Sequence, residues 1–268
     1  MHGAHPVRPR LIASDLDGTL LRSDGSVSPR TVTAVTACER AGMTMVLATG
    51  RPPRWIESIG DQLGQRGIAV CANGALVYDL DARRVVSSHP LSPEAMGEIV
   101  QRLRFAFPGV LFAVETVDHL GLEPGWKTAW TPPEGTRFAD ALELVQVPAV
   151  KLLARIDGHD VQAALSTKGR ELAHLAEVTW SGGQHLLELS APGVNKGATL
   201  AELAAQLHIP AAEVVAFGDM PNDLEMLRWA GRGLAVANAH EAIRAAADAI
   251  VGSNDDDGVA IELESLVA

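Results

Sequence analysis

The sequence predicts an α/β fold in which a doubly wound parallel-sheet core carries an inserted α+β domain. Two observations support this prediction. At both ends of the chain, short apolar runs alternate with amphipathic helical patterns, as expected of right-handed βαβ units. In the middle of the chain, strand-like runs outnumber helical patterns and the alternation is lost, which favours an antiparallel sheet.

The first part of the core is expected to contain buried strands that each end in a polar turn. Helices should separate these strands, because Ser28-Pro29 has the form of an N-cap followed by a first-turn proline, and Ile56, Ile59 and Leu63 recur at helical spacing. The strands are predicted from Leu11 to near Asp15, over 43–48 and over 68–72.

The inserted domain is predicted to begin at a hairpin, because Leu76–Tyr78 and Val85-Val86 flank a polar stretch. Two helices are expected to start at Ser92 and Asp160. The segment 121–141 is rich in Gly, Pro, Trp and Thr and is predicted to be irregular. Further strands are expected over 110–117 and 150–156, with a last hairpin within 178–189 that turns at Gly182-Gly183.

After residue 190 the alternating pattern of the core returns. A helix whose first turn holds Lys196 precedes buried strands over 214–217 and 234–236, and Asn238 with Glu241 resembles a capping box. We therefore expect a discontinuous core, residues 1–81 and 191–268, interrupted by an insert at 82–190.

The composition is that of a globular protein with room for one large domain or two modest ones. Of 268 residues 47% are hydrophobic, and the net charge of −11 argues against nucleic acid or an anionic membrane as a partner. Cys38 and Cys71 lie in apolar segments, which predicts buried free thiols in a reducing compartment. No apolar run approaches the roughly 18 residues of a membrane span, so a cytoplasmic location is expected.

Asp15 and Asp17 come directly after the first predicted strand, and Gly18 supplies a turn. Two carboxylates held about 4 Å apart repel by roughly 4 kcal/mol at an effective dielectric of about 20. If they point the same way, they must share a proton or meet a cation. A plain acidic turn at a strand end is the alternative interpretation.

Several polar turns should meet at one edge of the sheet, because the carboxyl ends of parallel strands share that edge and ligands bind there. Together their motifs resemble those of the haloacid dehalogenase superfamily of phosphotransferases, and most closely the Cof-like phosphatases with a type IIB cap. The resemblance rests on Ser14-Asp15-Leu16-Asp17-Gly18-Thr19, Thr49-Gly50-Arg51, Ala72-Asn73-Gly74, Gly193-Val194-Asn195-Lys196-Gly197, Gly218-Asp219 with Asn222-Asp223, and Asn254 to Val259.

The resemblance implies a Rossmann-like core, a cap formed by the insert, and a role for each motif residue. Asp15 would be the nucleophile that forms an aspartyl phosphate, and Asp17 the general acid and then the general base. Thr49 would donate a hydrogen bond to the phosphoryl group, and Lys196 would hold Asp15 and that group.

The resemblance also implies Mg²⁺, which suits oxygen ligands. Asp15, Asp219 and the carbonyl of Asp17 would bind the ion, with Asp223 mainly in its outer shell. The implied substrate-binding residues are Thr49, Gly50, Arg51, Asn73, Lys196 and Asn222. A structural role for Arg51 stays open, and Asn222 would contact phosphate or orient Lys196. The acidic run 255–257 is expected to be a solvated loop, although the family habit places it near the site.

The sequence thus predicts a Mg²⁺-dependent phosphomonoester hydrolase acting on a small phosphorylated metabolite such as a sugar phosphate. A phosphohexomutase with the same cap type is one alternative, and a catalytically silent metabolite-binding module is another. The spacing around Lys196 does not match a P-loop, and the scattered histidines do not suggest zinc.

Overall fold

The computed structural model describes residues 8–64, 67–182 and 185–268. The chain divides into two compact units, a core unit formed by Met1–Val86 with Asn195–Ala268 and an insert unit formed by Ser87–Val194. The mixed α/β architecture predicted from the sequence is confirmed. Independent folding of the two units stays a prediction.

The core unit is built on an eight-stranded sheet in the order β14-β13-β12-β1-β2-β3-β4-β5. The strands from β14 to β3 are parallel, and β4 runs antiparallel to β3. The strands are β1 (Leu11–Ser14), β2 (Thr44–Ala48), β3 (Ile68–Cys71), β4 (Leu76–Asp79), β5 (Arg84–Ser88), β12 (Val214–Gly218), β13 (Arg232–Val236) and β14 (Ala249–Val251).

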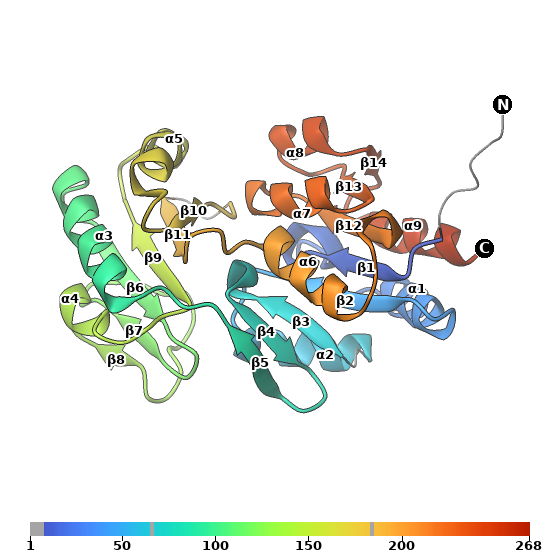
Figure 1. Cartoon of the computed structure of the whole chain (residues 1–268), viewed down its shortest axis with the longest axis horizontal. Coiled ribbons are helices and arrows are strands. Elements are labelled where there is room, and N and C mark those ends of the chain that lie inside the picture. Colours follow the sequence, from blue (N-terminus) through green and yellow to red (C-terminus); the bar gives the residue numbers. More distant parts are fainter. Residues whose placement is uncertain (1–7, 65–66, 183–184) are drawn as a thin grey trace. The chain divides into compact units, whose positions relative to one another are not determined.

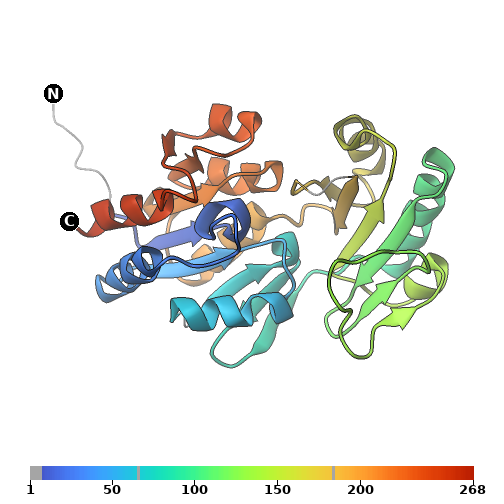
Figure 2. The ribbon, with the colours of Figure 1, turned by 180° about the vertical axis from the view of Figure 1, so that it is seen from behind.

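Helices cover both faces of this sheet, as expected of a doubly wound fold. On one face α1 packs against α2 and α9, and on the other α6 packs against α7 (Figure 1; Figure 2 shows the opposite side). The helices are α1 (Pro29–Arg40), α2 (Glu57–Leu63), α6 (Lys196–Gln206), α7 (Leu224–Trp229), α8 (Glu241–Ala246) and α9 (Gly258–Val267). The Ser28 hydroxyl caps α1 by accepting from the Thr31 amide, as predicted.

Strand β1 lies between β12 and β2 in the interior of the sheet. Leu11, Ile12 and Ala13 are fully buried, which is why the strand is a continuous apolar run rather than an alternating one. Because β1, β2, β3 and β12 are parallel, the polar turns that follow them leave the same edge of the sheet.

The hairpin of β4 and β5 extends the core sheet at its β3 edge. The sequence instead suggests that this hairpin begins the insert. Local alternation identifies two strands and a turn but does not show which sheet they join, and this is the physical reason for the difference.

The described residues of the insert unit form a six-stranded sheet in the order β10-β11-β9-β6-β7-β8 and three helices rather than the two expected. The predicted irregular segment 121–141 includes most of β7 and all of β8, a parallel pair in an otherwise antiparallel sheet. The elements are α3 (Pro93–Ala106), β6 (Leu111–Glu115), β7 (Leu120–Leu122), β8 (Arg137–Phe138), α4 (Ala141–Leu144), β9 (Lys151–Arg155), α5 (Val161–Leu172), β10 (Glu177–Thr179) and β11 (Leu186–Ser190).

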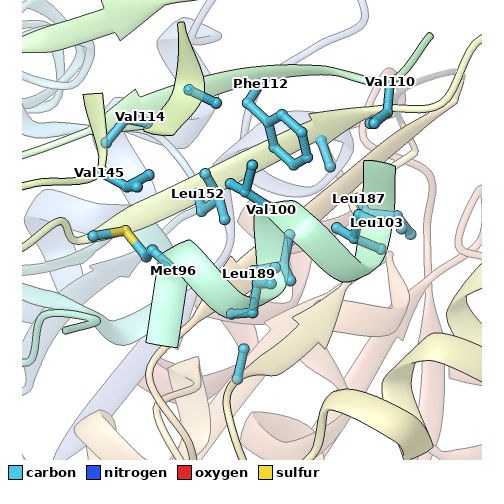
Figure 3. Close-up of a cluster of buried hydrophobic side chains, with 14 of the residues drawn as sticks. Met96, Val100, Leu103, Val110, Phe112, Val114, Val145, Leu152, Leu187 and Leu189 are labelled. Carbon is cyan, nitrogen blue, oxygen red and sulfur yellow. The ribbon is translucent and has the colours of Figure 1, made fainter. Parts of the chain in front are cut away.

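Helix α3 supplies much of the apolar core of the insert unit. Met96, Val100 and Leu103 line one side of α3 and lie among Phe112 and Leu152 of the sheet (Figure 3). The predicted N-cap Ser92 accepts a hydrogen bond from the Ala95 amide. The predicted turn at Gly182-Gly183 lies partly outside the described residues.

Among the described residues, no helix has both the length and the apolar character needed to cross a membrane.

Candidate active site

The chain leaves β1 through a tight turn that separates its two aspartates. We call residues 15–21 the acidic turn. The Asp15 amide still donates to the Phe217 carbonyl of β12 at 3.0 Å, so the backbone of Asp15 continues the pairing of β1 at its carboxyl end. Helical geometry within Leu16–Leu20 is interrupted at Asp17 and Gly18, and Gly18 has a φ of 75°. This left-handed φ favours glycine at the turn.

Lys196, the first residue of α6, places a buried ammonium between two carboxylates. Its side chain is fully buried, and Nζ lies 2.6 Å from Asp15 Oδ1 and 2.6 Å from Asp223 Oδ1. The Asn195 side chain accepts a hydrogen bond from the Ala198 amide and so caps the helix at this residue. The cap therefore helps to fix where the ammonium lies.

The turn after β12 brings two more carboxylates to Asp15. Asp223 Oδ2 accepts hydrogen bonds from the amides of Asp219 and Met220, each at 3.0 Å. The Thr19 hydroxyl donates to Asp219 Oδ1 at 3.0 Å, which ties the acidic turn to this second turn.

The three carboxylates fit a divalent cation that prefers oxygen ligands. One oxygen each of Asp15, Asp219 and Asp223 lies within 4.8 Å of the others. Three ionised carboxylates and one ammonium leave a formal charge of −2 in a buried site, which Mg²⁺ would balance. Asp223 already uses both of its oxygens for hydrogen bonds, whereas Asp15 and Asp219 are less committed.

Burial and mutual repulsion change how these groups bind protons. Burial raises the pKa of Asp15 well above its ordinary value; Lys196 opposes this shift, and Asp223 and Asp219 add to it. Burial and the charge of Asp223 raise the pKa of Asp219 to about 7. Burial works against the charged form of Lys196, but Asp15 and Asp223 outweigh it and its pKa ends above the usual range. The ammonium stays charged, and the carboxylates need a proton or a cation.

Asp17 lies outside this carboxylate group, contrary to the expectation that it forms a close pair with Asp15. Its side chain is 57% exposed, and Arg51 holds both of its oxygens through Nε, at 2.7 Å, and Nη2. The repulsion expected between Asp15 and Asp17 arises instead among Asp15, Asp219 and Asp223. Residue spacing alone does not show which way a side chain leaves a turn.

The remaining predicted residues follow β2, β3 and β12. The buried Thr49 hydroxyl accepts from the Arg51 amide at 3.1 Å, which leaves its own proton available to donate, and Gly50 lies between them. Asn73 has a φ of 57° and accepts from Asn222 Nδ2 at 3.1 Å. Asn222 Oδ1 is buried without a hydrogen-bond partner among the described residues.

Sequence reasoning missed several residues that hold the acidic turn. Asn238 does not form the predicted capping box; His240 caps α8 instead, and Asn238 donates to the Gly18 carbonyl. The run 255–257 is not merely a solvated loop, because Asp255 and Asp257 bind Ser23 and Arg22. Their proximity to the acidic turn arises from sheet order, which the local pattern does not show.

The chain is similar to known phosphatases over nearly its whole length. A family model described as haloacid dehalogenase-like hydrolase matches residues 12–263. Pyridoxal phosphate phosphatase YbhA of Escherichia coli (strain K12) is 28% identical over 264 residues, with 94% of this chain and 96% of that protein covered. Other curated relatives are also named as phosphatases.

Solved structures are also similar to this chain over nearly its whole length. A haloacid dehalogenase-like hydrolase from B. subtilis has 29% identity and a TM-score of 0.81, with 95% of this chain and 99% of that chain covered. A subclass IIB sugar phosphatase, at 19% identity, shares the fold with a TM-score of 0.80 over 97% of this chain and 100% of that chain.

Proposed function

The chain belongs to the haloacid dehalogenase-like hydrolases, and on this basis we propose that it is a Mg²⁺-dependent phosphomonoester hydrolase that works through a phosphorylated Asp15. The observation that carries the proposal is the buried contact of Lys196 with Asp15 inside a group of three carboxylates. A buried, oriented carboxylate with a fixed cation beside it is suited to attack an anionic phosphate.

In the first half-reaction, an oxygen of Asp15 attacks phosphorus while the bond from phosphorus to the ester oxygen breaks. Asp17, in its acid form, gives its proton to the departing oxygen. Lys196 stabilises the negative charge shared by Asp15 and the phosphoryl group. Thr49 and Asn222 are proposed to bind phosphoryl oxygens together with Gly50 and Asn73.

In the second half-reaction, water attacks phosphorus and the bond to Asp15 breaks. Asp17, now ionised, takes the proton of that water, so it returns to its acid form and Asp15 is regenerated. The exposure of Asp17 and its location beyond the carboxylate group suit a residue that exchanges protons without binding phosphorus.

Asp15 and Asp219, with the Asp17 carbonyl, would hold Mg²⁺, and Asp223 would act mainly from the outer shell because Lys196 and backbone amides already occupy its oxygens. When bound, the ion supplies charge that neutralises the carboxylates and the phosphate.

The proposed substrate is a small phosphorylated metabolite, such as a sugar phosphate. The YbhA relative is named for pyridoxal phosphate, also a small phosphate ester. No nucleic acid or membrane partner is proposed, given the net charge of −11. Cys38 and Cys71 are buried and neither forms a disulfide, which supports the proposal of a cytoplasmic location.

A screen of phosphorylated metabolites for phosphate release tests the proposal directly. Free phosphate from a hexose 1-phosphate supports the phosphatase, whereas hexose 6-phosphate as the product would identify a mutase. Binding of metabolites without turnover of any ester would identify a silent binding module.

A further inference from the structure

Two asparagines of the core unit hold the backbone of the acidic turn, and neither belongs to the proposed catalytic set. Asn238, which follows β13, donates from Nδ2 to the Gly18 carbonyl at 2.7 Å. Asn254, which follows β14, donates from Nδ2 to the Leu21 carbonyl at 2.9 Å. The Asn254 amide donates to Asn238 Oδ1 at 3.0 Å, so the two residues also hold each other.

The contact with Gly18 bears on the reaction because of what surrounds that glycine. Gly18 directly follows Asp17, and a Cβ at Gly18 would overlap Asp219 Oδ2, so the Asp219 carboxylate lies against the Gly18 backbone. The amide of His240, two residues after Asn238, donates to the Asp219 carbonyl at 2.8 Å. The segment 238–240 therefore fixes Gly18 and Asp219 relative to each other.

Arg22 and Ser23, which follow the acidic turn, are also held by hydrogen bonds, in this case to the segment before α9. Asp255 accepts from the Ser23 amide at 2.8 Å and from its hydroxyl at 2.7 Å. Asp257 accepts from Arg22 Nη2, with both oxygens at 2.9 Å. Consequently, the backbone carbonyl of Gly18 is part of a continuous set of fixed contacts rather than a group free to turn towards solvent.

We propose that Asn238 is a positioning residue for the reaction proposed above. Its amide holds the Gly18 carbonyl and thereby the backbone of the turn from which Asp17 reaches the leaving oxygen, while Arg51 holds the Asp17 side chain itself. Proton transfer depends on such geometry, because a misplacement of about 1 Å can cost about 10²-fold in rate. A residue that only stabilises the fold would change the melting temperature and leave the relative rates of different esters unchanged.

The variant Asn238→Asp separates these roles. It keeps an acceptor for the Asn254 amide and removes the donor to Gly18. We expect kcat/KM for an alkyl phosphate to fall about 10- to 100-fold. The value for p-nitrophenyl phosphate should fall less, because its leaving group needs no proton. The alkyl-to-aryl ratio of kcat/KM is therefore the measured quantity.

Two further variants complete the experiment. Asn238→Leu removes the donor without adding charge. If circular dichroism shows that Asn238→Asp does not fold, the alkyl-to-aryl ratio of Asn238→Leu is used instead. Asn238→Gln keeps a donor on a longer side chain and should recover part of the ratio. Ser253→Ala is the matched control, because the Ser253 hydroxyl bonds Asp256 in the same segment and does not contact the acidic turn.

A wild-type alkyl-to-aryl ratio in a folded Asn238→Asp or Asn238→Leu protein would overturn the positioning role, whatever happens to stability. A lowered ratio in these variants, with a wild-type ratio in Ser253→Ala, supports it. If the wild-type protein releases phosphate from no ester at all, the proposed function fails instead, so the two failures are distinguishable.

Discussion

Lys196 places a buried ammonium between the carboxylates of Asp15 and Asp223. Replacing Lys196 by Met keeps much of the side chain's volume and leaves Asp15 and Asp223 buried without their cation. Removing one partner of a buried pair typically costs about 3–5 kcal/mol. We expect phosphate release to be lost and the melting temperature to fall, measured by enzyme assay and thermal denaturation.

Lys168→Met provides the control for this substitution. Lys168 pairs with Glu171 on α5, where the two side chains are 20% and 56% exposed. An exposed pair contributes about 0–1 kcal/mol, so the control should melt and react almost as the wild type does. Equal melting temperatures for the two variants would contradict the role given to Lys196.

The pKa of Asp219 leads to a pH dependence of stability in metal-free protein. Its value of about 7 exceeds the ordinary 3.8, so between these values the folded protein holds a proton that the unfolded chain has lost. Folded protein then binds more protons, and its free energy of unfolding falls as pH rises from about 4 to about 7. Above pH 7 this contribution should level off.

Excess Mg²⁺ should reduce that fall, because the cation replaces the proton. Melting temperatures measured across this pH range, with chelator and with Mg²⁺, check the prediction. Asp219→Asn, which cannot ionise, should show a weaker pH dependence and a smaller response to Mg²⁺. Identical pH profiles for wild type with and without Mg²⁺ would rule out binding at these carboxylates.

Asp17→Asn should remove proton transfer from both half-reactions, typically worth about 10²–10⁴-fold in rate. The substitution keeps the shape of the side chain and its backbone carbonyl. With an aryl phosphate, formation of phosphorylated Asp15 should survive better than its hydrolysis, so the adduct should accumulate. Acid quench and mass spectrometry of the peptide that contains Asp15 detect it. Hydrolysis of aryl phosphates at the wild-type steady-state rate would show that Asp17 is not the base.

The sequence identifies Asp15, Lys196 and Asp219 as neighbours because parallel strands end at one edge of the sheet and the motifs lie in the turns at that edge. It does not identify the partner of Asp17. That partner is Arg51, and the pair depends on side-chain directions that spacing does not encode. The support from Asn238 is missed for the same reason.

At the level of elements, the close approach of α6 to the turn after β3 determines the position of Lys196, the first residue of α6. Gly74 has a φ of 103°, and a Cβ there would lie 2.6 Å from the Asn195 carbonyl carbon and 2.9 Å from Thr199 Oγ1. Gly74→Ala should therefore push α6 away from the site, lower kcat by at least about tenfold and lower the melting temperature.

Gly42→Ala is a matched control, since Gly42 also has a positive φ, 84°, but a Cβ added there would meet nothing within 4 Å. Both variants share the backbone strain of alanine in a left-handed conformation. Only the displacement of α6 differs between them. If both lower kcat equally, the close approach at Gly74 is not what matters.

Three helix starts are well predicted because the cap is a local interaction. Ser28, Ser92 and Asp160 each accept a hydrogen bond from the first turn of the helix that follows, as the sequence indicates. Strand partners are not local, and so the sequence pattern places the hairpin of β4 and β5 with the insert although it joins the core sheet. The short strand β8 is missed because two residues give no pattern.

For the molecule as a whole, the separate apolar cluster of the insert unit predicts that each unit folds without the other. A chain in which Ser87–Val194 is excised should keep a cooperative thermal transition and lose discrimination among substrates first. Circular dichroism and rates on a panel of esters measure these properties. Loss of cooperative unfolding in the truncated chain would refute independent folding of the core unit.

The long reach of the contacts around Asp15 has a consequence for biosynthesis. Lys196 follows Asp15 by 181 residues, and Asp257 follows Arg22 by 235. At roughly 5–20 residues per second, a ribosome needs on the order of 10 to 40 seconds to pass from Asp15 to Lys196. Throughout that interval Asp15, the proposed nucleophile, exists without the Lys196 ammonium and without Asp219. On the proposed mechanism, a nascent chain is therefore inert towards phosphate esters until the ribosome has passed Asp219.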